Sequence, residues 1–387
     1  MTTASVAVIG GGVIGASVAY HLALRGWRDV VLLDRAVRPG EGSTGRATGG
    51  YRAQYATPIN VRLSLLAREK LCRFEAETGT DPGYLRAGYL WLAADETELE
   101  SLRECQRIQH AEGLSEAVEV GPDEVARLNP ALAGEGIAGG VFCPTDGFVR
   151  PLRMLEGYLT AGERLGVRAE WGTEATGLSR RPDGTVSTVL TSRGRIGVAA
   201  VVNAAGAWAA AVAEWAGVSL PVTPLRRQAA ATVPCDLLPE SMPMTIFAGD
   251  GFHLRVRDRR VLLLWPTPGV QGDPFDVSVD PAWVRQVTAM AHQRVPVLRR
   301  AEIEPAACWA GLYEMSPDRH AILGPAPGCP NLFLVNGSSG HGVMHSPALG
   351  HLLAEIISDG LASTLDVHAL RPTRFAEGDA NPVSGLL

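Results

Sequence analysis

The first 34 residues limit what this chain can fold into more than any other stretch. Within them, Ser5–Asp34 reads SVAVIGGGVIGASVAYHLALRGWRDVVLLD. Val6–Ile9 is an apolar run without polar alternation, which is typical of a parallel strand buried on both faces. A glycine turn, a stretch with helical spacing up to Gly26 and a second apolar run, Val30–Leu33, follow. The order predicts a strand, a glycine turn, a helix and a second strand that ends in an acid.

The three glycines of the turn, at GxGxxG spacing, have separate physical roles. Gly10 permits the tight turn, Gly12 lets the backbone approach a pyrophosphate, and Gly15 lets the helix lie against the strand. The N-terminus of the expected helix presents free N–H groups and a partial positive charge that suit phosphates, and Val13 and Ile14 are among the predicted cofactor-binding residues.

The acid at the end of the second strand completes the pattern. Asp34 can accept hydrogen bonds from a ribose diol, and Arg35 beside it joins the predicted cofactor-binding residues. A lone GxGxxG is a weak signal, because an ordinary βαβ turn can carry it. With both strands, the helix and the acid in register, the sequence predicts a bound adenine dinucleotide.

The composition excludes several classes of protein. The 387 residues suffice for about two to three domains. A net charge of −6 argues against a nucleic-acid partner, and no apolar run is long enough to span a bilayer. The N-terminus enters a strand almost at once, so we expect no signal peptide and a cytoplasmic protein. None of the six cysteines forms a CxxC pair, so no metal site and no disulfide framework are predicted.

The nucleotide-binding character occurs in three separated pieces of the chain. Besides the opening unit, Val198–Asn203 reads as an apolar strand, and Asn336–Gly342 is a glycine loop after another strand. A helix follows this loop, with Ser346-Pro347 as its expected cap and first turn. Leu220–Pro305 differs, because its prolines and β-branched residues are typical of an antiparallel sheet. A nicotinamide-type domain is usually contiguous, so the split pieces favour FAD.

Four stretches carry a resemblance to a known family. They are VAVIGGGVIGASVAYHLALRG, STGRATGGYR, VVNAAGAWA and GLYEMSPDRHAILGPAPGCPNLFLVNGSSGHGVMHSPALGHLLAEII. Over nearly its whole length the chain resembles the D-amino-acid-oxidase superfamily of FAD enzymes. Within it, the chain is similar to sarcosine oxidases, to glycine oxidase, and to the β subunits of sarcosine and proline or hydroxyproline dehydrogenases.

The resemblance implies an α/β fold with a known layout. An FAD-binding, Rossmann-like domain of the glutathione-reductase type would hold residues 1–80, 141–218 and 317–370. An inserted α+β substrate domain with a mixed sheet would hold residues 81–140 and 219–316. Residues 371–387 would form a polar, loosely held tail.

The resemblance also implies most of the cofactor contacts. We expect the hydroxyls, amides and cation of the early glycine loop to lie beside the phosphates and the flavin. Backbone groups should lie near the adenine. The loop and helix around His341 should lie at the flavin. Beyond the opening unit, the expected cofactor-binding residues are Ser43, Thr44, Arg46, Ala47, Thr48, Gly49, Ala175, Ala205, Gly206, Trp208, Gly337, Gly340, His341, Gly342, Val343 and Met344.

Departures from the family predict that the FAD is not covalently bound. Gly311 stands where monomeric sarcosine oxidases tether FAD through cysteine. Arg46 lies near the tethering histidine of dimethylglycine-type enzymes, and Pro151 replaces the histidine that holds a covalent FMN in heterotetrameric enzymes. The sequence therefore predicts non-covalent FAD and no FMN, with a bond through Cys308 as the alternative.

Five residues are candidates for the catalytic site. Arg52 aligns with an arginine that pairs with the substrate carboxylate in relatives, although it could be an ordinary surface arginine. His341 should approach the flavin, as a catalytic or a structural histidine. Tyr313 could line the substrate side or cap a strand, and Tyr51 and His253 are weaker candidates.

Two further positions bear on the substrate and the oxidant. Met344 replaces a second carboxylate-binding lysine of monomeric sarcosine oxidases, which suggests a larger or less acidic substrate. Lys70 is the only lysine and lies on an expected surface helix, so the lysine that assists oxygen in some relatives is absent. A partner protein could therefore accept the electrons. The other possible acceptor is O2, with His341 or an arginine in the role of the missing lysine.

The function implied is oxidation of a C–N bond. A small amino acid or secondary amine, such as sarcosine, proline, hydroxyproline, glycine or a D-amino acid, would lose a hydride to flavin N5 and become an imine. A strong general base is not required if the pocket favours the neutral amine. One alternative is a tailoring oxidase for an amine in a larger molecule. The other is a non-catalytic, flavin-bearing assembly subunit. Partner subunits are possible.

Overall fold

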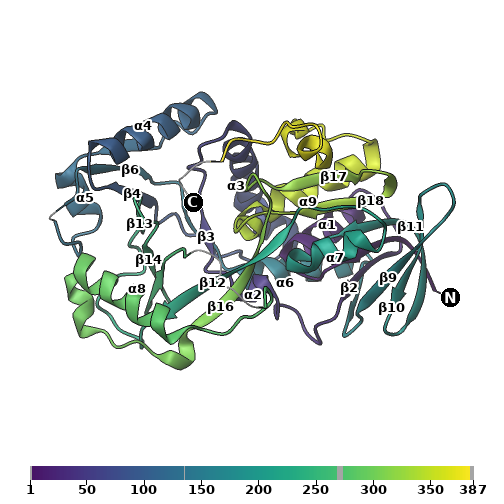
Figure 1. Cartoon of the computed structure of the whole chain (residues 1–387), viewed down its shortest axis with the longest axis horizontal. Coiled ribbons are helices and arrows are strands. Elements are labelled where there is room, and N and C mark those ends of the chain that lie inside the picture. Colours follow the sequence, from purple (N-terminus) through teal and green to yellow (C-terminus); the bar gives the residue numbers. More distant parts are fainter. Residues whose placement is uncertain (1, 135, 268–272, 384–387) are drawn as a thin grey trace.

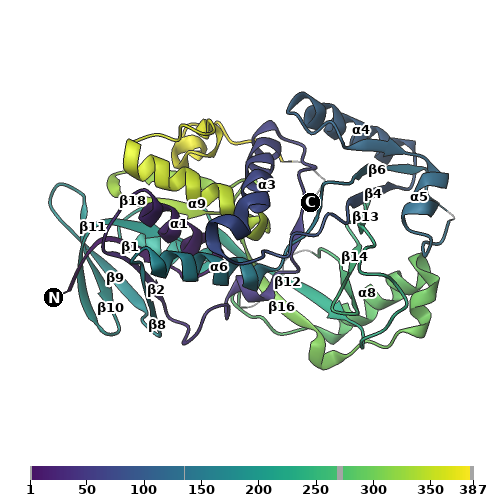
Figure 2. The same ribbon diagram turned by 180° about the vertical axis from the view of Figure 1, so that it is seen from behind.

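The computed structural model describes residues 2–134, 136–267 and 273–383. Two lobes, each built on a sheet of eight strands, lie side by side and are joined by β12 (Thr223–Ala231) and β16 (Trp309–Met315) (Figures 1 and 2). None of the helices in these ranges is long and apolar enough to cross a membrane.

The first sheet has a parallel centre in the order β18-β11-β1-β2-β8. β17 pairs antiparallel with β18 at one edge of this centre. β10 pairs antiparallel with β11, and β9 pairs with β10. The strands are β1 (Thr2–Ile9), β2 (Val30–Asp34), β8 (Arg168–Trp171), β9 (Ala175–Arg180), β10 (Val186–Thr191), β11 (Gly194–Asn203), β17 (Ile322–Ala326) and β18 (Cys329–Asn336).

Alternate residues of the central strands pack on opposite faces of this sheet. Val6 and Val8 join one core, whereas Ala7 and Ile9 join another, so β1 is buried on both faces as predicted. Three helices cover the first face, a fourth packs on two of them, and a short helix covers the second face (Figure 1). The helices of this lobe are α1 (Val13–Leu24), α2 (Ser43–Arg46), α3 (Pro58–Thr78), α6 (Pro151–Arg164), α7 (Ala209–Glu214) and α9 (Gly342–Asp359), with the 3-10 turns η1 (Gly206–Trp208), η4 (His368–Leu370) and η5 (Pro372–Phe375).

The second sheet is mixed and runs in the order β16-β12-β15-β14-β13-β4-β6-β5. Its remaining strands are β4 (Tyr89–Ala93), β5 (Val118–Val120), β6 (Gly139–Cys143), β13 (Met244–Phe247), β14 (His253–Arg257) and β15 (Arg260–Leu264). The helical elements of this lobe are α4 (Glu96–Ala111), α5 (Pro122–Leu128), α8 (Pro281–Arg294), η2 (Pro296–Arg300) and η3 (Pro305–Ala307). β6 pairs with β4 here, although residue 141 was expected to begin a piece of the nucleotide-binding domain.

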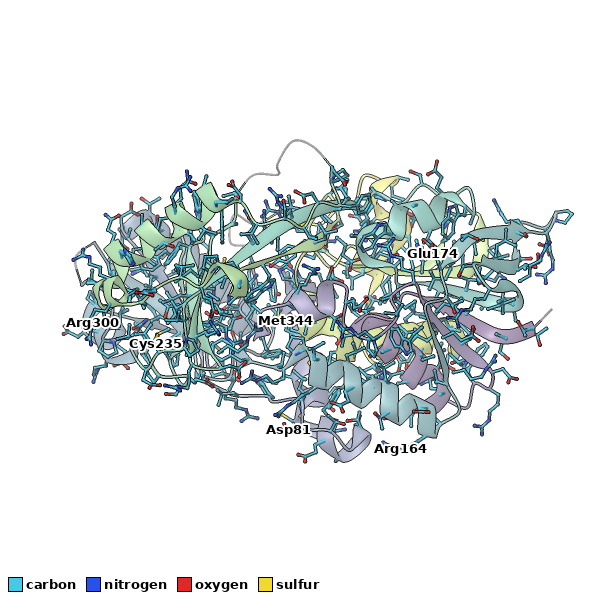
Figure 3. All side chains as sticks on the ribbon, turned by 90° about the horizontal axis from the view of Figure 1, so that it is seen from below. Asp81, Arg164, Glu174, Cys235, Arg300 and Met344 are labelled. Atoms are coloured by element: carbon cyan, nitrogen blue, oxygen red, sulfur yellow. The ribbon has the colours of Figure 1, made fainter. Side chains whose placement is uncertain are left out.

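Helix α9 begins earlier than the sequence suggested. Ser346 and Pro347 lie inside the helix, which starts at Gly342. Pro347 has no N–H to donate to the carbonyl of Val343, and the Ser346 hydroxyl donates to that carbonyl instead. The start of α9 therefore lies at the glycine loop, and Met344 is in its first turn, between the two lobes (Figure 3).

The C-terminal segment is anchored, which corrects the expectation of a loosely held tail. The side chain of Arg374 is fully buried, and its guanidinium donates two hydrogen bonds to the carboxylate of Asp318, at 2.7 and 2.9 Å. Asn381 donates to the same carboxylate. The pKa of Asp318 is lowered by these partners against the opposing effect of burial. Residues 384–387 of the expected tail lie outside the described residues.

Candidate active site

A long pocket of about 1320 Å³ runs from the glycine turn after β1 to the junction of β12, β16 and α9. Of the predicted cofactor-binding residues, Gly15 and Gly337 do not line it and all the others do. Gly15 packs the start of α1 against the Gly10 carbonyl, which is the role predicted for it. Gly337, with φ +68°, does not line the pocket, and a Cβ added there would face Ser316 and Ile322.

The glycine turn is held by two side chains. Asp34 accepts hydrogen bonds from the N–H groups of Gly11 and Ala36, at 2.7 and 2.8 Å. The hydroxyl of Thr44 accepts one from the N–H of Val13, the first residue of α1. Helix α1 has no acidic residue in its first turn, and the partial positive charge of this helix end is directed towards the pocket.

The early glycine loop is clamped by buried charged groups that the sequence analysis did not identify. Arg255 on β14 donates hydrogen bonds to the carbonyls of Thr48 and Gly49, and it stacks on Phe148. The carboxylate of Asp146 accepts a hydrogen bond from the N–H of Ala53 at 2.8 Å. Burial raises the pKa of Asp146 to about 6 and lowers that of Arg255 to about 9. Both groups hold the backbone on either side of Arg52.

Arg52 is buried at the centre of the site, so it is not a surface arginine. Its side chain is only 6% exposed. The guanidinium donates to the Gln54 carbonyl and stacks on Tyr55, 4.3 Å from the ring centroid. A second guanidinium nitrogen lies 3.3 Å from Nε2 of His341. Since guanidinium can only donate, Nε2 is the acceptor and the ring proton of His341 is on Nδ1.

The histidines of the site are neutral. Burial, followed by the Arg52 cation, lowers the pKa of His341 well below its usual range. His253 begins β14 and donates from Nδ1 to the Gly251 carbonyl, at 2.8 Å. Burial lowers its pKa to about 4, and the cations of Arg52 and Arg227 act in the same direction. Both predicted histidines line the pocket, and neither carries a charge near neutral pH.

The two predicted tyrosines lie in different places. Tyr313 on β16 lines the pocket and is 38% exposed, which favours the substrate side over a strand cap. Tyr51 does not line it: its side chain is fully buried and its hydroxyl donates to the Ser64 carbonyl. Alternation along the chain explains this, because Gly50 and Arg52 face the pocket and Tyr51 points the other way.

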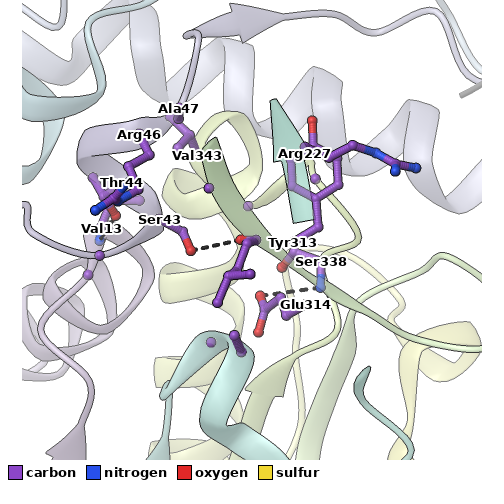
Figure 4. Close-up of a pocket in the computed structure, with 18 of the residues that line it drawn as sticks. Val13, Ser43, Thr44, Arg46, Ala47, Arg227, Tyr313, Glu314, Ser338 and Val343 are labelled. Atoms are coloured by element: carbon purple, nitrogen blue, oxygen red, sulfur yellow. Dashed lines mark hydrogen bonds between the residues drawn. The ribbon is translucent and has the colours of Figure 1, made fainter. Parts of the chain in front are cut away.

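Glu314, next to Tyr313, is a pocket-lining carboxyl that sequence reasoning missed. Its Oε1 accepts a hydrogen bond from the N–H of Ser338, whereas Oε2 is buried and has no hydrogen-bond partner among the described residues (Figure 4). Burial raises the pKa of Glu314 to about 7, against the opposing effect of its hydrogen bonds.

The residues of the pocket fit an FAD. The glycine turn leaves no room for a side chain: a Cβ on Gly10 would collide with the Ala204 carbonyl. Ser43, Thr44 and Arg46 from α2 line the pocket beside this turn, where their hydroxyls and guanidinium would suit phosphates (Figure 4). The N–H groups that begin α9 face the far end, where no acidic residue stands in the first turn. Cys308, the alternative tether, does not line the pocket.

Comparison with known proteins identifies the family. The family described as FAD dependent oxidoreductase matches residues 5–356, so the chain belongs to this family of enzymes and FAD is its cofactor. Glycine oxidase of Geobacillus kaustophilus is 30% identical over 366 residues, which cover 91% of this chain and 92% of that protein. The structure of L-proline dehydrogenase from P. horikoshii superposes with a TM-score of 0.89 at 27% identity, covering 98% of this chain and all of that one.

Other relatives are longer proteins. Mitochondrial dimethylglycine dehydrogenase of Rattus norvegicus is 29% identical over 97% of this chain, but the match covers only 45% of that protein. The chain thus spans less than half the length of the dimethylglycine dehydrogenases it matches. The predicted family and fold class are confirmed by these comparisons.

The buried carboxyl of Glu314 predicts a pH-dependent affinity for FAD. Because its pKa is near 7, Glu314 is mostly neutral at pH 6 and mostly ionised at pH 8. A negative charge that faces the pocket opposes a cofactor that carries phosphates. The affinity for FAD should therefore fall between pH 6 and 8 by up to about tenfold. Fluorescence titration of apoprotein with FAD measures this, and Glu314→Gln should remove the dependence.

The matched control for this titration is Glu174→Gln. Glu174 lines the same pocket but is exposed, so its removal should leave the pH dependence in place. An equally steep dependence in Glu314→Gln would show that another group titrates.

Proposed function

We propose that this chain is an FAD-dependent oxidase or dehydrogenase that oxidises the C–N bond of a small amino acid or secondary amine to an imine. The observation that carries the proposal is the buried Arg52 in the wall of the cofactor pocket. Its planar fork suits a carboxylate, which it binds as two parallel hydrogen bonds. The names of the relatives, which include a glycine oxidase and a proline dehydrogenase, support a substrate with an amine beside a carboxylate.

Each nearby group has a defined task in this proposal. Arg52 binds the carboxylate of the substrate, and the neutral ring of His341 holds the guanidinium by accepting its hydrogen bond. His341 is thus a positioning residue, since its Nε2 lone pair is already engaged. Tyr313 closes the substrate side of the pocket. Bound FAD supplies the hydride acceptor at N5.

The charges around the pocket favour the neutral amine. Arg52 and Arg227 line it, and both act to lower the pKa of His253. The same positive potential disfavours a protonated amine, which has no lone pair on nitrogen to stabilise the developing imine. The substrate can therefore lose its proton to water before oxidation, and a strong base in the protein is not needed.

Anaerobic mixing of the holoenzyme with single amines tests the proposal. Sarcosine, glycine, proline, hydroxyproline and D-amino acids form the panel, and loss of the visible flavin absorbance is recorded. We expect at least one member to bleach the FAD within seconds and to yield its imine or oxo product. Bleaching only by larger amines would support the tailoring oxidase, and bleaching by no amine would support the assembly subunit.

The same samples identify the electron acceptor. Admitting air to the reduced enzyme should restore the colour at once in an oxidase, whereas a dehydrogenase should need a dye or a partner protein. Lys70 lies on α3 and does not line the pocket, which supports an acceptor other than O2. A cytoplasmic location and association with partner subunits stay predictions from the sequence.

A further inference from the structure

Arg227, an arginine of the other lobe, faces the same pocket as Arg52. Arg227 lies on β12, is half-buried, and lines the pocket. One nitrogen of its guanidinium donates to the Thr267 carbonyl at 2.6 Å, and its Cζ lies 5.8 Å from the ring centroid of Tyr313. Figure 4 shows the two side chains next to each other in the wall of the pocket. Among the described residues the bond to Thr267 is the hydrogen bond that the guanidinium makes, and its other N–H groups could donate to a ligand.

Arg227 has no acidic partner in the part of the chain that the structure describes. Its neighbour Arg226, on the opposite face of the strand, pairs with Asp276 and does not line the pocket. Burial lowers the pKa of Arg227, with the cation of Arg319 acting in the same direction. Withdrawing a cation from water without an anionic partner is costly, so such a group in a pocket wall is suited to an anionic ligand.

Arg52 and Arg227 are fixed at different places in the pocket wall. Arg52 is held by the Gln54 carbonyl and His341, on the side of α9. Arg227 is held by the Thr267 carbonyl, which follows β15 in the other lobe. Tyr313 and His253 each respond to both cations, which places these two side chains within the field of both arginines. A substrate lying against Tyr313 would therefore lie near the cations of both arginines.

We infer that Arg227 binds a second carboxylate of the substrate, so that the preferred substrates are amino or imino acids with two carboxylates. Arg52 takes the carboxylate beside the amine, and Arg227 takes the one further along the molecule. The inference rests on the proposed function and adds its substrate class. It differs from the expectation of a less acidic substrate drawn from Met344, because it takes the second cation from β12 instead of α9.

Binding of redox-inert acids to the holoenzyme tests this inference without turnover. Acetate is compared with malonate, succinate and glutarate, and the shift of the flavin spectrum gives each dissociation constant. At least one dicarboxylate should bind roughly 10- to 100-fold more tightly than acetate, as expected for one additional charge-assisted contact. Arg227→Gln should remove most of this preference. Arg226→Gln, the matched control on the other face of β12, should retain it.

Anaerobic reduction by iminodiacetate, aspartate and glutamate, against sarcosine and glycine, gives the second readout. Arg227→Gln should slow reduction by the preferred dicarboxylate roughly 10- to 100-fold more than reduction by monocarboxylates. Equal losses for both classes would overturn the inference, since Arg227 would then share the single carboxylate with Arg52. Wild-type enzyme without any preference for dicarboxylates in binding would overturn it as well.

Two further outcomes are separable from these. Selective dicarboxylate binding without reduction by any amine would contradict the proposed function and leave the anion site in place.

If Arg227→Gln does not fold, Arg227→Lys keeps the charge but loses the fork. That variant should show an intermediate preference for dicarboxylates, and an unchanged preference would contradict the fork-like contact.

Discussion

Replacing Arg52 by leucine should lower kcat/KM for an amino acid substrate by about 30- to 1000-fold. The figure corresponds to about 2–4 kcal/mol, the cost of losing a buried, charge-assisted pair with a carboxylate. The effect should be large because Arg52 is buried and pre-oriented by Gln54 and His341, so binding does not have to order its side chain. Stopped-flow measurement of flavin reduction across substrate concentrations gives the value.

Two controls separate carboxylate binding from a structural effect of Arg52. Arg52→Lys keeps the charge without the planar fork and should recover part of the rate. An amine of similar size without a carboxylate should be oxidised at nearly the same rate by wild type and Arg52→Leu. If the variant lost the same factor with both kinds of amine, Arg52 would act on the fold or the cofactor and not on the carboxylate.

Replacing Gly15 by alanine should nearly abolish FAD binding. The added Cβ would overlap the backbone carbonyl of Gly10, closer than any real Cβ contact, and backbone cannot move aside as a flexible side chain can. Relieving the overlap must shift α1 away from β1 and distort the turn that faces the phosphates. A cost of about 3 kcal/mol corresponds to a loss of affinity of more than a hundredfold.

Gly42→Ala is the matched control for Gly15→Ala. Gly42 lines the same pocket, but a Cβ there would meet nothing within 4 Å, and its φ of −82° suits any residue. Adding FAD to apoprotein should raise the melting temperature of wild type and Gly42→Ala, but not of Gly15→Ala. An equal rise in both variants would contradict the role given to the close approach of α1 and β1.

The sequence predicted the structure best where the residues that bind the cofactor also determine the local backbone conformation. The unit from β1 to β2 could be predicted because an unbroken apolar run, three spaced glycines and a terminal acid each limit the backbone locally. Helix α9 could be predicted as an element but not its start, because Pro347 suggests a first turn and only the Ser346 hydroxyl explains why the helix continues through it.

The polar groups that shape the site from behind were not predictable in this way. Arg227 and Arg255 each stand in a strand where a charged residue usually faces water, and their burial depends on how two lobes distant in sequence come together. The roles of Asp146 and Glu314 could not be predicted for the same reason. Their hydrogen-bond partners, Ala53 and Ser338, are brought to them by the tertiary structure. Arg374 was assigned to a loose tail because its partner, Asp318, lies 56 positions away in sequence.

The most direct test of the account is the fate of the flavin when the purified protein is denatured. The pocket from the glycine turn to α9 should hold one FAD per chain without a covalent bond, since Gly311 and Arg46 replace the tethering residues and Cys308 lies outside it. Acid precipitation should release all yellow colour into the supernatant, where chromatography identifies intact FAD. Colour that stays with the polypeptide, or protein that remains colourless after saturation with FAD, would contradict the account.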